Sequence, residues 1–461
     1  MKVSIFEENK RLKEELEKEK RLRKEWHKKY EEIHKEYKEL EKKYNQLKNS
    51  NTPSSQIPVY LKQFSITREL GKKKRGRKKK RIVNVRTSPE KHDEEVIAKA
   101  DCCPKCESKK LKEKDTYSFT VYDLPKIELV YRKATVKIFG CMDCGFEFEG
   151  KHPKVPTKGQ IGPGLQSLFT ILKHHFGGAY GKISKFTEEL TGEKFCKQTI
   201  NNTISNVAET LTPSYNNMKE QVKKAKVKQS DETGWPVNGK SWWLWVIVTT
   251  NLVFLSIDKS RGSKVLKKIF GVAEDFVGVL VSDCYCAYQA YRVVAQKCWL
   301  HLLRKAKFEA KKHPKKDVKT LFESLSSIYM SMRTFLKKNP SESERILQAI
   351  IYKQKLDRIC KSNWKSDSAV TLVKRIRKYI SQWLVGVIIP EVPLHNNDNE
   401  RPIRSLALPR KVCGGHRTEK GAVDFTIIAS HLQSWRKRGM SQFNELFSFL
   451  SKSYSGLNPT I

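Results

Sequence analysis

Apolar residues near the start of the chain recur at alternating intervals of three and four positions. One set of these positions is occupied mainly by Ile and Leu, and the other includes Tyr30, Tyr37 and Tyr44. This spacing is typical of a left-handed coiled coil, so we predict one over residues 1–49 that joins copies of the chain into a homo-oligomer. The number of strands stays open, because three successive tyrosines in the seam favour no particular number.

The periodicity is lost over residues 50–100, where Pro, Ser and Asn break the helix and apolar residues are too sparse to build a core. We therefore predict a disordered linker. Its segment 68–81 is dense in Lys and Arg and is centred on Arg75 and Arg77. An extended Arg-Gly-Arg can lie in the narrow minor groove of A·T-rich DNA. A basic tether that neutralises phosphates without reading sequence is the simpler interpretation.

Two Cys-x-x-Cys pairs lie in the next predicted module, residues 101–150. The candidate ligands are Cys103, Cys106, Cys141 and Cys144. Four thiolates suit tetrahedral zinc, and redox cysteines are the alternative. Alternating apolar positions at 117–121 and 136–139 predict the strands of a zinc-ribbon-like module. Cys102 competes with Cys103, which is chosen because it keeps the two-residue spacing.

Helical periodicity returns over residues 151–225. A helix at 184–190, a turn, and a second helix at 198–211 predict a helix-turn-helix. The second helix would present polar side chains to DNA bases, namely Lys197, Gln198, Asn201 and Asn202. A plain helical support for the following domain is equally consistent with the pattern, and both interpretations stay open.

From residue 226 the pattern becomes that of an α/β domain. Apolar runs at 242–248 and 252–257 predict a hairpin, a helical segment follows, and the run 277–282 predicts a buried strand. Together with a first strand that ends near Asp231, three strands, a helix and a fourth strand match the order of a ribonuclease-H-like core.

The rest of the chain divides into two predicted parts. Residues 302–390 are rich in Lys, Leu, Ile and Glu with helical periodicity, which predicts helices. That they form a helical insertion into a core whose first part is 226–301 follows only from the triad assignment implied by the resemblance described below. Residues 391–461 are predicted to complete the core with C-terminal helices.

The charge of the chain points to a polyanionic partner. Lys and Arg number 91 against 50 Asp and Glu, a formal net charge of +41 over 461 residues. This suits double-stranded DNA better than small acidic substrates. No apolar run approaches the roughly 20 residues of a membrane-spanning helix, and the N-terminus lacks the apolar core of a secretory signal. The odd number of cysteines, 11, favours a reducing compartment.

Three acidic residues stand in settings that suit metal-dependent chemistry. Asp231 ends an alternating stretch, Asp283 follows the buried run, and Glu400 lies where a loop enters a helix. Carboxylates at strand ends and on a later helix can converge on two hard divalent cations, which prefer oxygen ligands. Two such ions stabilise both the attacking and the leaving oxygen of a phosphoryl transfer.

Five motifs surround these acids in order. They are Asp231-Glu-Thr, Ser256-Ile-Asp-Lys-Ser-Arg-Gly262, Val281-Ser-Asp-Cys-Tyr-Cys-Ala-Tyr288, Cys298-Trp-Leu-His301 and Asn397-Asp-Asn-Glu-Arg-Pro-Ile-Arg404. Together they resemble the motifs of insertion-sequence 66 family transposases. The resemblance implies a ribonuclease-H-like catalytic domain whose DDE triad is Asp231, Asp283 and Glu400, with two Mg²⁺ or Mn²⁺ ions per active site. It also implies a structural zinc segment ahead of that domain.

The resemblance implies a function as well. A DDE transposase cleaves transposon ends and transfers the strands into target DNA, here in the cytoplasm of a prokaryote at the nucleoid, with accessory proteins as further candidate partners. The alternatives are a ribonuclease-H-like structure-selective nuclease and a catalytically silent, transposase-derived DNA-binding protein. The presence of all three acids disfavours the silent protein.

Further site residues flank the triad. Cys298 and His301 resemble a Cys-x-x-His element of several DDE transposase families, which implies that His301 contacts the scissile phosphate or positions the triad. A zinc site there is disfavoured because no second pair lies nearby. The candidates to hold DNA phosphates near the metals are Arg401, Arg404, Arg410 and Lys411.

Overall fold

The computed structural model describes residues 91, 93–113, 115–124, 126–312, 316–457 and 459, and leaves aside a few side chains within these ranges, among them those of Glu400 and Arg401. The predicted coiled coil at 1–49 and most of the linker, with Arg75 and Arg77, lie outside the described residues. In the described part, no helix is long and apolar enough to cross a membrane.

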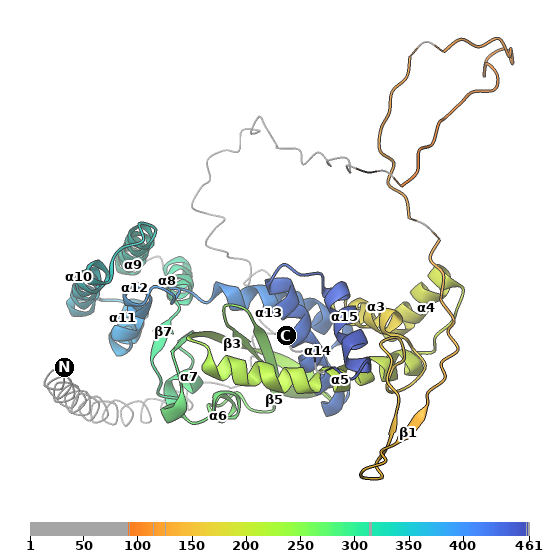
Figure 1. The fold of residues 1–461 in the computed structure, drawn as a ribbon. Helices are drawn as coiled ribbons and strands as arrows, with labels where there is room; N and C mark the ends of the chain where they lie inside the picture. The colour runs from red at the N-terminus through yellow and green to blue at the C-terminus, as the bar shows by residue number, and fades with distance from the viewer. Residues whose placement is uncertain are drawn as a thin grey trace, which may run out of the picture. The chain divides into compact units, whose positions relative to one another are not determined.

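The module with the Cys-x-x-Cys pairs contains one short hairpin, β1 (Ile138–Gly140) and β2 (Glu147–Glu149), which are antiparallel (Figure 1). The strand predicted at 117–121 is wrong, because these residues form no strand. Their apolar side chains remain exposed, 85% for Tyr117 and 73% for Phe119. Alternation of apolar and polar residues produces a strand only where a partner strand and a core take up the apolar face.

Within the described residues, three helices precede the sheet, α3 (Pro163–His174), α4 (Tyr180–Thr191) and α5 (Lys197–Lys224). Gly192 ends α4 in the left-handed conformation, with φ 78°. The Cys196 side chain caps the N-terminus of α5. One face of α5 is buried against α14 (Glu419–Lys437), while Gln198, Asn201 and Asn202 at its start are exposed. Both helices of the predicted helix-turn-helix are present, and α5 also supports the core.

A five-stranded mixed sheet forms the centre of the next domain. Its strands are β3 (Val227–Val237), β4 (Lys240–Val248), β5 (Val253–Asp258), β6 (Val279–Ser282) and β7 (Ala295–Lys297). They lie in the order β5-β4-β3-β6-β7. β3, β4 and β5 form an antiparallel meander, and β6 and β7 run parallel to β3. This mixed α/β arrangement is compatible with the ribonuclease-H-like core predicted from the sequence.

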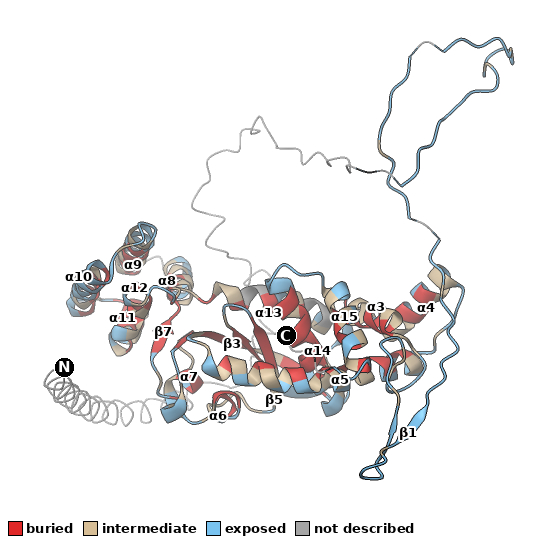
Figure 2. Cartoon of the chain, in the orientation of Figure 1, coloured by how far each residue is buried: buried red, intermediate tan, exposed pale blue. Residues whose placement is uncertain are grey.

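Helices cover both faces of this sheet, and Figure 2 shows that the strands are largely buried. On one face, α5, α6 (Lys264–Phe270) and α7 (Cys286–Ala290) pack against apolar residues such as Trp245 and Phe254. On the other face, α13 (Asn397–Cys413) and α14 pack against alternate residues such as Leu244 and Val246. The last helix, α15 (Gln442–Tyr454), joins α3 and α5 in a separate cluster.

The predicted helical insertion has a hydrophobic core of its own. It consists of α8 (Trp299–Lys312), α9 (Lys316–Leu336), α10 (Glu342–Lys361), α11 (Asp367–Lys378) and α12 (Val385–Ile388). Tyr352 and Trp383 lie fully buried in this core. Figure 1 shows these helices grouped beyond β7, at one edge of the sheet. The insertion therefore adds a helical body without interrupting the strand order.

β6 approaches β3 closely because it begins after a glycine. Gly278 has φ +82°, and a Cβ atom at this position would lie 2.1 Å from the carbonyl oxygen of Lys226. The next residue, Val279, donates its N–H to that same oxygen at 2.8 Å. A side chain at residue 278 would therefore push β6 away from β3 at the point where their pairing starts.

We expect Gly278→Ala to lower the free energy of unfolding by roughly 2–4 kcal/mol, because it combines positive φ with a backbone collision. Urea denaturation followed by tryptophan fluorescence measures the loss. The matched control is Gly234→Ala in β3, where a Cβ atom would meet nothing within 4 Å of the described structure. Equal stability of the two variants would contradict this account of the β3–β6 junction.

Candidate active site

Asp231 and Asp283 lie side by side on neighbouring parallel strands. The register of β3 and β6 pairs Gln229 with Val281. Two residues further along each strand direction, the same register brings Asp231 level with Asp283, which follows the end of β6. Because side chains alternate between the faces of a sheet, residues two apart point to the same side. The two acids singled out from the sequence are thus brought together at the carboxyl end of β6.

The start of α13 is fastened to β3 next to these acids. The buried side chain of Asn396 donates from Nδ2 to the carbonyl oxygen of Ser230 at 2.9 Å, and its Oδ1 accepts from Nδ2 of Asn399 at 2.9 Å. Gln229 Nε2 donates to Asp398 Oδ2 at 2.8 Å. These contacts fix the first turn of α13 against the residues just before Asp231.

Glu400 lies in this first turn of α13, so its backbone is held on the side of the sheet that α13 covers. Its side chain is not among the described ones, and its position relative to Asp231 and Asp283 stays a prediction. Sequence reasoning selected the acid of this motif but missed its asparagines, which act by holding the helix. These asparagines lie in a run of polar residues that is typical of an exposed loop, so the sequence does not distinguish them.

Cys298 and Trp299 join the core to the segment that leads into α13. The N–H of Cys298 donates to the carbonyl oxygen of Ser282 at 2.8 Å, and the N–H of Trp299 donates to that of Leu394 at 3.0 Å. The thiol of Cys298 accepts from the N–H of Asn396 at 3.2 Å. Burial raises the pKa of this thiol to about 11. Through these hydrogen bonds the buried Cys298 holds the segment that leads into α13 against the end of β6.

His301 lies in the first turn of α8 and is half-buried. Cys298, three residues earlier, touches both the end of β6 and the start of α13 through the hydrogen bonds described above. The predicted place of His301 beside the acids is therefore consistent with the fold. Its role toward DNA stays a prediction.

A buried lysine donates hydrogen bonds to Asp283 and to the residue before it. Lys297 in β7 is only 1% exposed, and its Nζ donates to Ser282 Oγ at 3.1 Å and to the carbonyl oxygen of Asp283 at 3.0 Å. Burial lowers the pKa of this amine. The sequence reading missed Lys297, since a strand of three residues containing Gln and Lys has the appearance of an exposed turn.

A second charged network lies on the face of β3 opposite to the Asp231 side chain. Glu232, the next residue, accepts from Nε and Nη2 of Arg261 on Oε1 at 3.0 and 2.9 Å, and from the hydroxyl of Tyr288 on Oε2 at 2.5 Å. Burial raises the pKa of Glu232, and the nearby carboxylate of Asp283 adds to the rise. The sequence placed these residues in motifs but assigned them no role.

The candidate phosphate-binding residues of α13 differ in their surroundings. Arg404 and Lys411 are exposed, and the side chain of Arg401 is not described. Arg410 is half-buried and donates from Nη1 to the carbonyl oxygen of Gly234 at 2.5 Å and to Thr233 Oγ1 at 3.3 Å. Arg410 therefore also fastens the end of α13 to β3.

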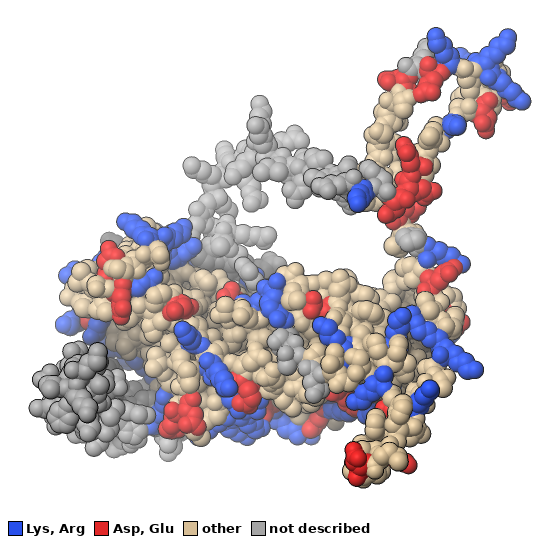
Figure 3. Space-filling model, in the orientation of Figure 1, with Lys and Arg blue, Asp and Glu red and all other residues tan. Residues whose placement is uncertain are grey.

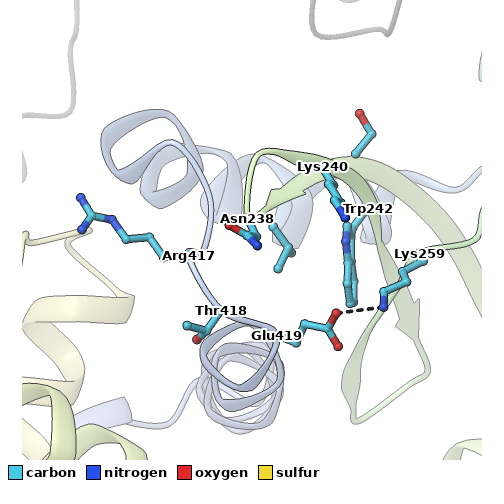
Figure 4. Close-up of a pocket in the computed structure, with 9 residues that line it drawn as sticks. Asn238, Lys240, Trp242, Lys259, Arg417, Thr418 and Glu419 are labelled. Atoms are coloured by element: carbon cyan, nitrogen blue, oxygen red, sulfur yellow. Dashed lines mark ion pairs between the residues drawn. The ribbon is translucent and has the colours of Figure 1, made fainter.

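A cavity of about 450 Å³ lies at the far end of the β3–β4 hairpin, as Figure 4 shows. Its lining includes Lys240, Trp242, Lys259, Arg417 and Glu419. Lys259 pairs with Glu419 at 2.9 Å. The cavity begins six residues beyond Asp231 along β3, on the order of 20 Å for an extended strand. It is a basic hollow separate from Asp231 and Asp283, neither of which lines it.

Both Cys-x-x-Cys pairs fold into the same turn. In each, the N–H of the first cysteine, Cys103 or Cys141, donates to the carbonyl five residues on, and its own carbonyl accepts from the N–H four residues on. That fourth residue has positive φ, 57° at Glu107 and 72° at Gly145. The matching hydrogen bonds favour Cys103 over Cys102 as the first residue of its turn.

The turns favour the thiolate form of their first cysteines but do not complete a metal site. Backbone N–H groups, that of Lys105 foremost in one turn and that of Cys144 in the other, lower the pKa of Cys103 and of Cys141. A lowered pKa favours the thiolate that zinc binds. Within the described ranges, however, no group of three or more His, Cys, Asp or Glu side chains is close enough to hold a metal ion. The structure does not bring the two pairs together.

A protein-family model matches the central part of the chain. The family model described as "Transposase IS66 family" matches residues 158–424, more than half of the chain, from the loop before α3 into α14. The match contains Asp231, Asp283 and Glu400. Curated protein sequences gave no match.

We expect Asn396→Ala to loosen α13. The change leaves the Ser230 carbonyl and the Asn399 amide without their buried partner, which costs roughly 2–4 kcal/mol, and it should speed hydrogen exchange at the start of α13 more than in β4. Asn397→Ala is the matched control, because the described residues offer its buried side-chain oxygen no hydrogen bond. Unchanged exchange in the Asn396 variant would show that the tether is dispensable.

Proposed function

Because the chain belongs to the IS66 family of transposases, we propose that it cleaves transposon ends and joins them to target DNA by phosphoryl transfer at Asp231, Asp283 and Glu400. The observation that carries this proposal is the register of β3 and β6, which sets two carboxylates side by side beneath the helix that bears Glu400. A family of transposases acts on DNA, and the charge of +41 suits that partner.

The residues present fit a pair of hard divalent cations. Asp231 and Asp283 supply carboxylate oxygens on adjacent strands, and Glu400 would add a third from α13. When bound, Mg²⁺ or Mn²⁺ would supply positive charge that stabilises the attacking and the leaving oxygens. Lys297 holds the backbone of Asp283 in place through its carbonyl oxygen.

The proposed chemistry has two displacements at phosphorus. In the first, the oxygen of water bonds to the phosphorus at the transposon end and loses a proton, while the bond from phosphorus to the 3′ oxygen breaks and that 3′ oxygen gains a proton. In the second, the new 3′-hydroxyl loses its proton and its oxygen bonds to a target phosphorus, while the bond from that phosphorus to the target's 3′ oxygen breaks and this leaving oxygen gains a proton. No covalent enzyme intermediate is needed. His301, at the start of α8, is a candidate to contact the scissile phosphate.

DNA would approach across a basic surface. Figure 3 shows Lys and Arg side chains distributed over the visible face of the core and of the insertion helices. The cavity with Lys240 and Arg417 offers cations for a phosphate further along the strand. Arg404 and Lys411 extend the same role along α13. The exposed amides at the start of α5 are candidates to read bases at the transposon end.

The segments outside the described residues keep their predicted roles in this proposal. The coiled coil at 1–49 would pair two copies of the chain and thereby two transposon ends. The linker with Arg75 and Arg77 would hold DNA phosphates as a flexible basic tether. Both roles rest on the sequence alone.

We expect Asp231→Asn, Asp283→Asn and Glu400→Gln each to lower cleavage and joining by roughly a hundredfold or more, since each removes a metal-binding charge. DNA affinity should change little, because it rests on Lys and Arg. The assay incubates the full chain with a duplex carrying the inverted repeats that flank its coding sequence, a target plasmid and Mg²⁺.

The control for lost charge is Asp275→Asn, an exposed acid after α6, which should stay fully active. Joined products from the wild-type chain support the transposase. Cleavage without joining would indicate a nuclease, and binding without cleavage a silent DNA-binding protein. Near-normal joining by any one triad variant would remove that residue from the triad.

The two Cys-x-x-Cys turns are proposed to close around one zinc ion through Cys103, Cys106, Cys141 and Cys144. What supports this is the shared turn geometry and the lowered pKa of the first thiol in each. Zinc would then supply the folding energy that a module with mostly exposed side chains lacks.

We expect protein purified without chelator to contain about one zinc ion per chain. Cys106→Ser and Cys141→Ser should each lose it and become sensitive to protease between residues 100 and 150, whereas Cys102→Ser should keep it. Metal analysis and limited proteolysis measure both effects. Full zinc content in the two ligand variants would refute the four-thiolate site.

A further inference from the structure

The loop after β5 is held rigidly beside the sheet. Asp258 Oδ1 accepts from the N–H of Ser260 at 2.7 Å, and Ser260 Oγ accepts from the N–H of Gly262 at 3.0 Å. The carbonyl oxygen of Ser260 accepts from Nε1 of the buried Trp245 at 3.2 Å. These bonds fix the backbone on both sides of Arg261.

The guanidinium of Arg261 is held on three sides. Its central carbon lies 4.3 Å from the ring centre of Trp243 and 3.9 Å from that of Tyr285, so aromatic rings flank it. Its Nε and Nη2 donate to Oε1 of Glu232, a carboxylate whose side chain is 1% exposed. Stacking and a carboxylate partner together fix the plane and the direction of the guanidinium.

The side chain of Arg261 is only partly covered. It is 38% exposed, whereas the side chain of its partner Glu232 is 1% exposed. A guanidinium has five N–H donors in a planar fork, and the bonds to Glu232 use donors of one edge, so the donors of the other edge remain for a second partner. A fixed fork with donors exposed suits an anion with several oxygens, such as a phosphate.

Arg261 is linked to both aspartates. Glu232, its partner, directly follows Asp231 in β3. Tyr285, which stacks on it, donates its N–H to Asp283 Oδ1 at 2.9 Å. Because side chains alternate along β3, Glu232 and Arg261 lie on the face opposite to the Asp231 side chain, and the contact with Tyr285 brings the guanidinium close to the end of β6, where Asp283 lies.

We propose that Arg261 binds a phosphate of the DNA strand next to the one that is cut, and that Glu232 is the positioning residue that aims it. This inference rests on the proposed function, because it requires DNA at the Asp231–Asp283 site. Lysine could not replace Arg261 here, since an ammonium ion cannot donate to Glu232 and to a phosphate in one plane.

The test pairs protein variants with DNA that carries a single neutral methylphosphonate, moved one position at a time around the cleavage site. The full-length protein is measured for binding to the duplex with the flanking inverted repeats, and for cleavage. Arg261→Lys and the double change Glu232→Gln with Arg261→Gln are compared with wild type. The double variant leaves no unpaired buried carboxylate, so it separates loss of function from loss of folding.

For the wild type, we expect one methylphosphonate position to weaken binding about tenfold, in the range of a charge-assisted phosphate contact. Arg261→Lys and the double variant should each bind unmodified DNA about tenfold more weakly than the wild type. A methylphosphonate at the sensitive position should then weaken their binding no further. Arg436→Gln, an exposed arginine in the last turn of α14, should show the full additional loss. Arg261→Lys and the double variant both leave the net charge unchanged, whereas this control removes one positive charge, so a loss of charge alone cannot produce the expected contrast.

One outcome is that the wild-type chain binds and cuts the duplex while, at every position, the loss of affinity from the methylphosphonate adds in full to the loss from the Arg261 variants. Arg261 then serves only to neutralise Glu232, and this inference is overturned. If the wild-type chain neither binds nor cuts the duplex, the proposed function is overturned, and this inference with it.

Discussion

The parallel pairing of β3 and β6 is the interaction on which the candidate site depends. The register that matches Gln229 with Val281 is also the one that sets Asp231 level with Asp283. A slip of one residue would turn one carboxylate to the opposite face of the sheet. Gly278 permits the close start of this pairing, and Lys297 braces its end from β7. Two acids far apart in sequence thus become neighbours through backbone hydrogen bonds rather than through contacts of their own.

The remaining parts of the site are attached to this pair through buried polar groups. Asn396 donates hydrogen bonds to the carbonyl oxygen of Ser230 in β3 and to the thiol of Cys298 before α8, and its side-chain oxygen accepts one from Asn399 in α13. On the opposite face of the sheet, Glu232 of β3 accepts hydrogen bonds from Arg261 and Tyr288. Buried polar groups are stable only when their partners are all present. The site is therefore expected to form as one unit with the core and not as a separately mobile loop.

The sequence predicts the parts of this fold whose signal is local. The apolar runs of β4, β5 and β6 and the helical periodicity of 302–390 identified real elements, and the two aspartates were recognised from the strands they end. β7 was not predicted, because Gln and Lys in a short segment are typical of a surface turn, although here both are buried. The strand at 117–121 was predicted from alternation, which gives no information about whether a partner strand is present. The roles of Asn396 and Arg261 depend on residues distant in sequence, which no local pattern encodes.

The insertion is closed at its base. The helices α8 to α12 leave the core at Cys298 and Trp299 and return at Leu394 and Asn396, and hydrogen bonds join these two points directly. The positions at which the chain enters and leaves the insertion are thus fixed by hydrogen bonds at the core and not by the helices of the insertion. The free-energy cost of a longer loop between fixed ends rises only slowly with its length. Helices could then be added to or removed from this body while the geometry of the candidate site stayed constant.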